Sequence, residues 1–461
     1  MSCPLTRPCS DSDNSSNSTN LPLTARQWRW IVVIALLGFL YKSFTLRAPW
    51  FLLPAMPAVP SDHSCAVHHA DRLAFCEDFT TLPGSPLLVL SCDSARREWN
   101  HLRNVFAPNL PAGELWLFDP ALPAKTPKRI VLPDTLTDFR PLGISAAGGD
   151  GEIRLFVANQ AKRGPRIEVI DIDLPAVAAD ADTGTGTDTG PDAHGTAGPG
   201  HLAGRHVATL TDALIASPNS VAAVDRNGFF MTNDVMFPRS WAVVGELLSG
   251  LPGGSLVYVA LDGAALVPSA KRIARLALAN GVAVDPQHRR LWVAGSLSGV
   301  SQYIYSAADP TRIEQGAFLR TAMLPDNILF SPASGGLYVS GLTSLRAFVE
   351  SQVNASALAP PSLSVQLLPK LPLRNTDKSR VAWRGNDVSN VALRRDEWRW
   401  GTVFVDNGSF FGGVSTGGVV DGGRFVGVSL LQSGVVVCSE PPVRGGIVPE
   451  KKKDHKAKDE L

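Results

Sequence analysis

The sequence has almost no excess of charge of either sign. Its 43 Lys and Arg residues are balanced by 42 Asp and Glu residues, which leaves a formal net charge of +1. Proteins that bind nucleic acid through its phosphates carry a basic surface, so the composition gives no indication of a nucleic-acid partner. With 461 residues, 44% of them hydrophobic, the chain has ample material for a large core, and its length allows one to three domains.

The sequence also lacks a long hydrophobic run. The apolar stretch from Trp30 to Tyr41 has 12 residues, whereas a helix needs ~17–25 to cross the hydrocarbon of a bilayer. If the ammonium group of Lys42 reaches the membrane edge, the stretch continues to Leu46 and gives a short anchor. No clear small-residue cleavage site follows, which favours an uncleaved signal-anchor or transmembrane segment over 28–46 rather than a removed signal peptide.

The C-terminus carries an address for the endoplasmic reticulum (ER). Its last four residues, Lys458–Leu461, form the retention signal Lys-Asp-Glu-Leu, which a retrieval receptor reads in the lumen. We therefore expect a membrane-anchored protein with a cytosolic N-terminus and a luminal main part. The predicted flanking segments are a disordered N-terminus over 1–27, a linker over 47–64 and a basic tail over 441–461.

Between these ends a short pattern recurs with different sequence. It comprises an amide or carboxylate residue in most copies, a small residue, and two apolar stretches, and its six copies begin at Glu77, Leu142, Asn219, Asn280, Asp326 and Ser389. Repeated short apolar strands at such spacing indicate propeller blades, whereas solenoids need helices or tighter periods. We predict an all-β fold, a six-bladed β-propeller over 65–440, with a disordered insertion at about 180–205 where large apolar residues are scarce.

The innermost strands of a propeller line a central channel, so equivalent positions in successive blades form a ring. The predicted ring contains Glu77, Asn219, Asn280 and Asp326, with Asp78 and Asn327 alongside. Carboxylates buried together are costly, and a cation is the usual remedy. Oxygen donors without His or Cys suit Ca²⁺ better than zinc or copper. Turn formation is the better explanation for any single Asn or Asp, but recurrence in four blades favours a calcium site.

Six cysteines in a luminal protein indicate disulfides. Cys65 and Cys438 lie just outside the two ends of the repeats, where a covalent bond keeps the ring from opening, and we predict that they pair. Cys76 and Cys92 are then either free and buried or paired.

Two further features lie within the predicted propeller. Sequons at Asn354 and Asn407 are candidate glycosylation sites on the luminal side. The spacing of Val244, Leu247, Leu248 and Leu251, with Trp241 one turn earlier, predicts a helix after Pro238. A lid over the channel and a membrane-surface helix are both compatible with it, and packing of its apolar face onto the blades is the simplest explanation.

Several stretches, in register over about residues 65–440, resemble one known family. They are Glu77-Asp78 with Leu82-Pro83-Gly84, Pro141–Ser145, Leu155–Asn159, Asn219, Thr232–Asp234, Ala279–Gly281, Asp326-Asn327, and Asp406–Ser409 through Cys438. The chain resembles the serum paraoxonase/arylesterase family. Its members are calcium-dependent six-bladed propeller lactonases and aryl esterases with a retained N-terminal hydrophobic segment.

The resemblance implies two calcium sites. The ligands of the catalytic ion would be Glu77, Asn219, Asn280, Asp326 and Asn327, the same ring that the repeats indicate. The structural ion would use Asp78 and the backbone carbonyl of Ile144, but Ser220 stands where the family has its other acidic ligand.

The histidine pair to which the family's water activation is assigned is replaced in this sequence. Leu142 and Gln160 occupy the two positions, and neither side chain acts as a general base near pH 7. The remaining candidate proton acceptors are the carboxylates of Asp326 and Glu77, which are our predicted catalytic residues, and the loop histidine His101.

Three functions are compatible with these features. The first is a calcium-dependent hydrolase of aryl esters or lactones in the ER lumen, with weak activity because the histidine pair is replaced. The second is a catalytically silent paraoxonase-like ER chaperone or assembly factor for membrane proteins. The third is a gluconolactonase-like or strictosidine-synthase-like propeller. We favour the first, because a purely structural role needs fewer ligands exposed in the channel.

Overall fold

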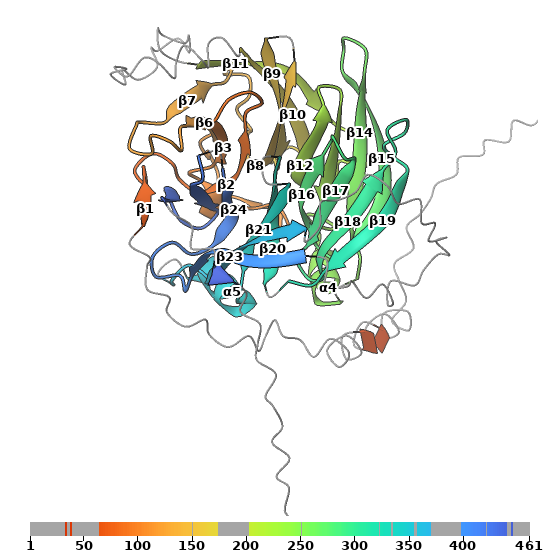
Figure 1. The fold of residues 1–461 in the computed structure, drawn as a ribbon. Coiled ribbons are helices and arrows are strands. Elements are labelled where there is room, and N and C mark those ends of the chain that lie inside the picture. The colour runs from red at the N-terminus through yellow and green to blue at the C-terminus, as the bar shows by residue number, and fades with distance from the viewer. Residues whose placement is uncertain are drawn as a thin grey trace, which may run out of the picture.

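The computed structural model describes residues 33–34, 37–38, 64–149, 151–173, 202–249, 251–321, 323–332, 335–354, 357–369, 398–420, 422–439 and 444–445. Its strands group into six four-stranded antiparallel units, seen around a common centre in Figure 1. Blades one and two share an eight-stranded sheet, because β7 and β11 pair in parallel at Ile130 and Leu202.

The strands follow the chain from the centre of each blade outward. Blade one is β2 (Cys76–Thr81), β3 (Leu88–Cys92), β6 (Glu114–Phe118) and β7 (Lys128–Val131). Blade two is β8 (Pro141–Gly149), β9 (Glu152–Asn159), β10 (Arg166–Asp173) and β11 (Leu202–Leu210). Blade three is β12 (Pro218–Asp225), β13 (Gly228–Asn233), β14 (Gly254–Asp262) and β15 (Val267–Leu276).

Blade four is β16 (Ala279–Asp285), β17 (Arg290–Gly295), β18 (Gly299–Tyr305) and β19 (Ile313–Leu319). Blade five is β20 (Leu324–Ser331), β21 (Gly336–Leu342), β22 (Ser362–Pro369) and β23 (Trp398–Asp406), extended by β27 (Arg444–Gly445). Blade six is β24 (Val414–Val419), β25 (Phe425–Ser429), β26 (Val435–Cys438) and, from the other end of the chain, β1 (Cys65–His68).

The inner strands form a closed ring, because β2, β8, β12, β16, β20 and β24 each contact the next and β24 contacts β2. This is a propeller-like arrangement, as the repeats predict. The second strands β9, β13 and β21 are buried along nearly their whole length, since neighbouring blades cover both faces of each sheet. A core cluster containing Phe156, Val221 and Phe229 joins blades two and three in this way.

Covalent closure of the ring agrees with the prediction. β1 pairs with β26 from Cys65 opposite Cys438 to His68 opposite Val435, and Cys65 and Cys438 form a disulfide. Cys76 and Cys92 are buried and form a second disulfide within blade one, which decides the alternative that the sequence leaves open.

The sixth repeat predicted from Ser389 is wrong. Residues 389–392 lie outside the described part, and the predicted partner stretch 402–405 belongs to β23, the outer strand of blade five. The sixth inner strand is β24, whose Gly-, Ser- and Thr-rich sequence lacks the apolar pattern of the other five.

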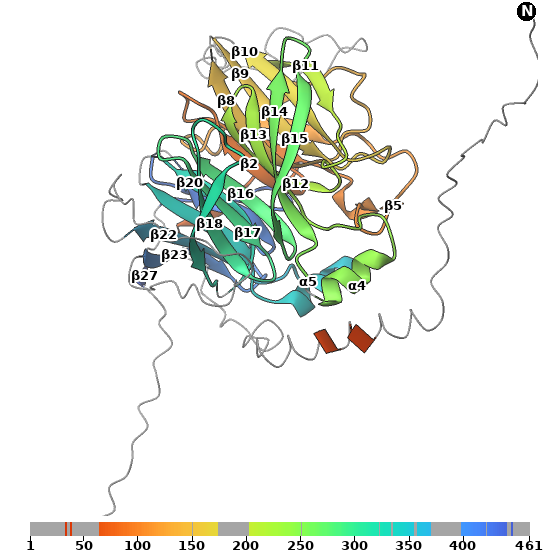
Figure 2. The same ribbon diagram turned by 90° about the vertical axis from the view of Figure 1, so that its right-hand side faces the viewer.

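Several connections gather at one end of the blades. The 3₁₀ turn η1 (Arg96–Glu98) and the hairpin β4 (Trp99–Asn100) and β5 (Val105–Phe106) follow β3, helix α4 (Ala242–Ser249) follows β13, and helix α5 (Leu345–Val353) follows β21. The ends of β3, β13 and β21 pair with the starts of inner strands. Figure 2 accordingly shows β5, α4 and α5 at the same end of the molecule.

Most of the predicted flanking segments lie outside the described residues. This holds for 1–27, for 28–46 apart from four helical residues, for 47–63, and for Lys458–Leu461. No helix in the described part is long and apolar enough to cross a membrane. The predicted insertion at 180–205 is undescribed up to residue 201, but its last residues already belong to β11, and Arg444–Gly445 of the predicted tail pair with β23.

Candidate functional site

The predicted ring residues lie at one repeated irregularity of the inner strands. In every blade the register between the first and second strand shifts near the start of the inner strand. Such a shift is a β-bulge. The residues left out of register are Glu77, Leu142-Gly143, Asn219-Ser220, Asn280-Gly281, Asp326-Asn327 and Ser415. A bulge changes the direction of side chains that would otherwise alternate between the two faces of the sheet. The six bulges therefore place residues at corresponding positions at one end of the channel.

The turn explanation for the Asn and Asp residues does not hold. Asn219, Asn280 and Asp326 all lie inside inner strands rather than in the loops between strands. The glycine after Asn280 serves close packing, because a Cβ on Gly281 would lie 2.5 Å from the Cα of Asn327. Gly143 likewise lies against Ser220, so small residues let the inner strands of neighbouring blades converge on the ring.

Four oxygen atoms of the ring are buried without a hydrogen-bond partner among the described residues. They are Glu77 Oε2, Asn219 Oδ1, Asn280 Oδ1 and Asn327 Oδ1. Nearly all buried polar atoms in proteins are satisfied, so four unpaired acceptors at the inner-strand bulges need a common explanation. A cation that accepts oxygen ligands would satisfy all four together.

The ring side chains converge across the channel. The amide of Asn327, in blade five, donates to Glu77 Oε1 in blade one over 3.0 Å. The hydroxyl of Ser415, in blade six, donates to the Glu77 carbonyl at 2.6 Å. Asn280 in blade four donates to Ser296 Oγ at 3.2 Å and also hydrogen-bonds the carboxyl group of Asp326.

Burial strongly disfavours the ionised form of the carboxyl groups of Glu77 and Asp326. Burial, together with repulsion from Asp78 and Asp326, raises the pKa of Glu77 well above its ordinary value. Burial raises the pKa of Asp326 to about 7, against the opposing hydrogen bond from Asn280. Among the described residues no cluster of three or more His, Cys, Asp or Glu side chains is arranged to hold a metal ion. Amide oxygens would therefore have to complete any donor set, and oxygen-only sets of this kind suit calcium.

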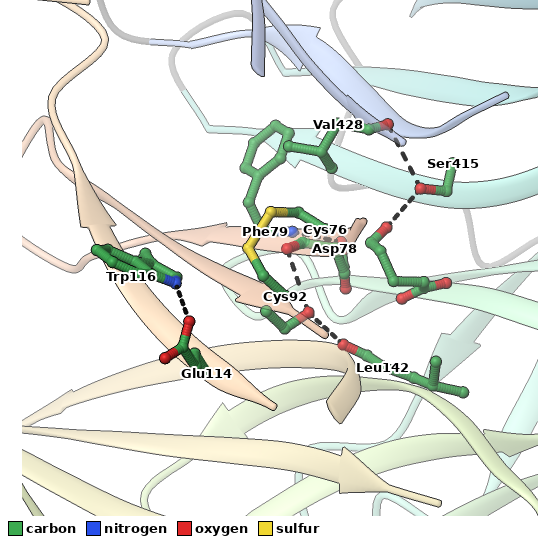
Figure 3. The surroundings of a disulfide bond; sticks show 11 residues. Cys76, Asp78, Phe79, Cys92, Glu114, Trp116, Leu142, Ser415 and Val428 are labelled. Carbon is green, nitrogen blue, oxygen red and sulfur yellow. Dashed lines mark hydrogen bonds between the residues drawn. A yellow bond between two sulfur atoms is a disulfide. The ribbon is translucent and has the colours of Figure 1, made fainter. Parts of the chain in front are cut away.

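The site of the second implied calcium ion does not fit. Asp78 Oδ2 accepts from the Ile144 N–H at 3.0 Å, and its Oδ1 accepts from Phe79 N and Thr416 Oγ1, each at 2.8 Å. Burial still raises the pKa of Asp78 to about 7, opposed by these three bonds. Both oxygens of the Asp78 carboxyl group thus already accept hydrogen bonds from the protein, and Ser220 supplies no charge. Figure 3 shows Asp78 enclosed beside the Cys76–Cys92 disulfide, and we assign no role to a second ion.

The cation of Arg96 faces the ring, which nothing in the sequence indicates. Burial lowers the pKa of Arg96, and attraction to Glu77, Asp93 and Asp326 opposes that change. Its guanidinium lies over the ring of Trp99, 4.4 Å from the centroid. The loop that follows β3 therefore brings a positive charge to the carboxylates of the ring.

The two positions of the missing histidine pair have structural roles. Leu142 is fully buried in the core cluster with Phe156 and Val221, and its carbonyl accepts a hydrogen bond from Ser91 Oγ. Gln160 is buried and donates from Nε2 to the Pro218 carbonyl at 2.7 Å, which ties blade two to the strand that carries Asn219.

The remaining predicted residues lie elsewhere. Asn354 is exposed at the end of α5, and Asn407 is half-buried after β23, where its Oδ1 accepts from Ser409 N at 3.0 Å. His101 is 6% exposed and contacts Asp234 through its Nε2 at 2.8 Å. Asp234 follows β13, so this contact lies at the ring end of blade three.

Comparisons with known proteins agree with the family resemblance. The Arylesterase family model matches residues 201–363, a range that contains Asn219, Asn280 and Asp326. Serum paraoxonase/arylesterase 2 of Homo sapiens is 23% identical over 325 residues, which cover 70% of this chain and 75% of that protein. Serum paraoxonase/arylesterase 1 of Mus musculus is 28% identical over 138 residues, covering 29% and 36% of the two chains. The chain is a distant relative of the arylesterases.

Solved structures give weaker matches. A gluconolactonase of Xanthomonas campestris aligns at 16% identity with a TM-score of 0.34, covering 62% of this chain and 82% of that chain. The nidogen/laminin complex aligns at 13% identity with a TM-score of 0.33, covering 63% and 73%. TM-scores this low support no conclusion about this chain.

Proposed function

We propose that this arylesterase relative is a calcium-dependent hydrolase of lactones or aryl esters. We further propose that it works in the ER lumen, anchored through residues 28–46 and retrieved through Lys458–Leu461. The observation that carries the proposal is the set of four buried, unpaired oxygens at the inner-strand bulges, on Glu77, Asn219, Asn280 and Asn327. These four residues and Asp326 would hold the ion.

A bound calcium ion would polarise a substrate carbonyl and stabilise the negative charge that develops on its oxygen. The chain's own part is to keep the donors in place before substrate arrives. Asn327 holds Glu77 across the channel, and Ser415 fixes the Glu77 backbone. Arg96 adds a positive charge at the same end of the channel.

We expect slow turnover. General-base assistance typically contributes ~10²–10⁴ in rate, and the positions of the family's two histidines here hold a core leucine and a strand-tethering glutamine. Asp326 and Glu77, our predicted catalytic residues, belong to the ion-binding ring, where a bound cation makes a carboxylate a weaker proton acceptor.

The alternative is a catalytically silent chaperone or assembly factor, and one observation favours it. The segment around α4 exposes large apolar side chains at the ring end, with Phe237 49%, Trp241 72% and Val244 55% exposed. The apolar face predicted for this helix is therefore turned largely outward, and Val243 is the buried residue instead. Such a surface suits contact with an apolar partner.

The test uses the full-length protein in detergent. Metal analysis after purification, melting with and without chelator, and initial rates on a panel of lactones and phenyl esters are measured together. We expect bound calcium, a lower melting temperature after chelation, and turnover that requires calcium. Asn280→Ala should reproduce the effect of chelation. Asn227→Ala, in the exposed turn at the opposite end of blade three, is the matched control. Absence of calcium and an unchanged melting temperature would refute the metal site, and bound calcium without turnover would leave the assembly function.

A further inference from the structure

His101 has one ring nitrogen engaged and the other unpaired. Its side chain is 8% exposed, and Nε2 lies 2.8 Å from Asp234 Oδ2. Because an ionised carboxylate can only accept hydrogen bonds, the proton of a neutral imidazole would lie on Nε2, and Nδ1 would keep its lone pair. Nδ1 is buried and has no hydrogen-bond partner among the described residues. A buried acceptor without a partner indicates that a water molecule or a ligand group occupies that position.

The carboxylate that orients His101 is itself fixed. Ser217 Oγ donates to Asp234 Oδ1, and the Asp234 N–H donates to the Ser217 carbonyl at 3.1 Å. The Ser217 N–H in turn donates to Asn233 Oδ1 at 2.7 Å. Ser217 lies two residues before Asn219, which is part of the bulge of β12. The imidazole is therefore held at the edge of the ring contributed by blade three.

The loop that carries His101 is held in place by several further contacts. Asp93 and Arg140 form a buried ion pair of 3.2 Å, and Trp99 Nε1 donates to Asp93 Oδ2 at 2.9 Å. Arg96, in the same loop, lies over Trp99 and is attracted to the ring carboxylates. Beyond His101, the Leu102 carbonyl accepts from Arg239 N at 3.1 Å. These contacts hold the imidazole in one position, as a catalytic group requires.

We propose that His101 is the proton acceptor of the hydrolytic reaction and that Asp234 is its positioning residue, in place of the family's histidine pair. This inference rests on the proposed function. Nδ1 would take a proton from water as the water oxygen bonds to the carbonyl carbon of the lactone or ester. When the carbon–oxygen bond to the leaving group breaks, the same Nδ1–H would return the proton to the departing oxygen, so that acid and alcohol are formed without a further reactant.

Other carboxylate-paired histidines in the described part differ from His101. Nε2 of His206 forms a hydrogen bond with Glu168 at 2.9 Å, but the same nitrogen also contacts Thr209 on the outer strand of blade two. His288 bonds Asp285 at 2.7 Å, is 43% exposed, and lies at the opposite end of β16 from the ring. His288 therefore provides a matched control for a His–Asp pair remote from the site.

The decisive variant is His101→Gln. A glutamine side chain can still donate a hydrogen bond to Asp234, which preserves the local structure, but its amide is no base. We expect kcat on a lactone or phenyl ester to fall by ~10²-fold or more, the usual share of general-base catalysis. KM, bound calcium and melting temperature should stay near the native values. His288→Gln should retain native kcat. Added imidazole should restore part of the rate to His101→Ala, because it can enter the space that the side chain leaves.

Three results would overturn the inference, and they are distinguishable. Native kcat in His101→Gln shows that the imidazole takes no part, while leaving the hydrolase intact. Loss of kcat together with loss of calcium, and without imidazole rescue in His101→Ala, shows a structural role only. Native protein that binds calcium but turns over no substrate rejects the hydrolase itself, and this inference with it.

Discussion

The close approach of blades four and five at the ring gives a direct test of the architecture. Gly281 lies in the bulge of β16, beside the bulge of β20. A Cβ placed on it would lie 2.5 Å from Asn327 Cα, 2.6 Å from the Asp326 carbonyl oxygen and 2.7 Å from Ile328 N. All three are backbone atoms, so no side chain can turn away to make room.

The magnitude of the effect of Gly281→Ala follows from these distances. Non-bonded carbon atoms prefer a separation of ~3.5–4.0 Å, so the two inner strands must move apart by about 1 Å at the point where Asp326 and Asn327 enter the ring. Overpacking of this kind typically costs ~1–3 kcal/mol of unfolding free energy. The same displacement moves two of the five predicted calcium ligands relative to Asn280, so calcium affinity should fall as well.

The measurement is denaturant unfolding in the presence and absence of calcium, with calcium titration of the folded protein. Gly245→Ala is the control, because Gly245 lies in α4 with no atom within 4 Å of an added Cβ. That change should stabilise by ~0.5–1 kcal/mol, as replacement of glycine within a helix does. If Gly281→Ala unfolds and binds calcium like the native protein, the inner strands do not converge as described.

Two other predictions concern stability. Serine replacement of both members of Cys65–Cys438 should cost about 6 kcal/mol in the chain-entropy model, against about 3 kcal/mol for Cys76–Cys92, since the first closes a loop of 373 residues and the second one of 16. Comparable losses measured by urea unfolding would show that ring closure does not depend on the first bond. Arg140→Met should cost ~3–5 kcal/mol because it leaves Asp93 buried and unpaired, and faster proteolysis within 93–110 should accompany it. An unchanged cleavage rate would show that the ion pair does not hold the loop.

Much of the propeller was predictable from the sequence, because five of the six inner strands repeat one local sequence pattern. Asn219, Asn280 and Asp326 each lie near the start of an apolar strand, within the bulge that changes the direction of their side chains. The pairing of Cys65 with Cys438 follows from topology, since the ends of a closed ring must meet. Blade six was missed because its ring position is Ser415, in a strand whose glycines pack against Phe425 and Tyr338 instead of supplying apolar side chains.

The contacts around the ring were not predictable, because they join residues far apart in the sequence. His101 and Asp234 are 133 residues apart, and Asn327 and Glu77 are 250 apart. The periodicity of apolar residues predicts the secondary structure of a segment and its pairing with neighbouring segments. A loop such as 93–110 has no such periodicity. Its position depends on the buried pair of Asp93 and Arg140, which only the folded chain brings together.

The replacement of the family's histidines changes what blade two contributes to the site. Leu142 occupies a bulge like the ring residues of the other blades, yet its side chain lies in the core between blades two and three. Gln160 places its amide on the Pro218 carbonyl, so it supports the strand of Asn219 instead of facing a substrate. Blade two therefore stabilises the ring, and its two histidine positions supply no proton acceptor. Among the described residues the His101–Asp234 pair is the one that places a buried histidine nitrogen without a hydrogen-bond partner at the ring end.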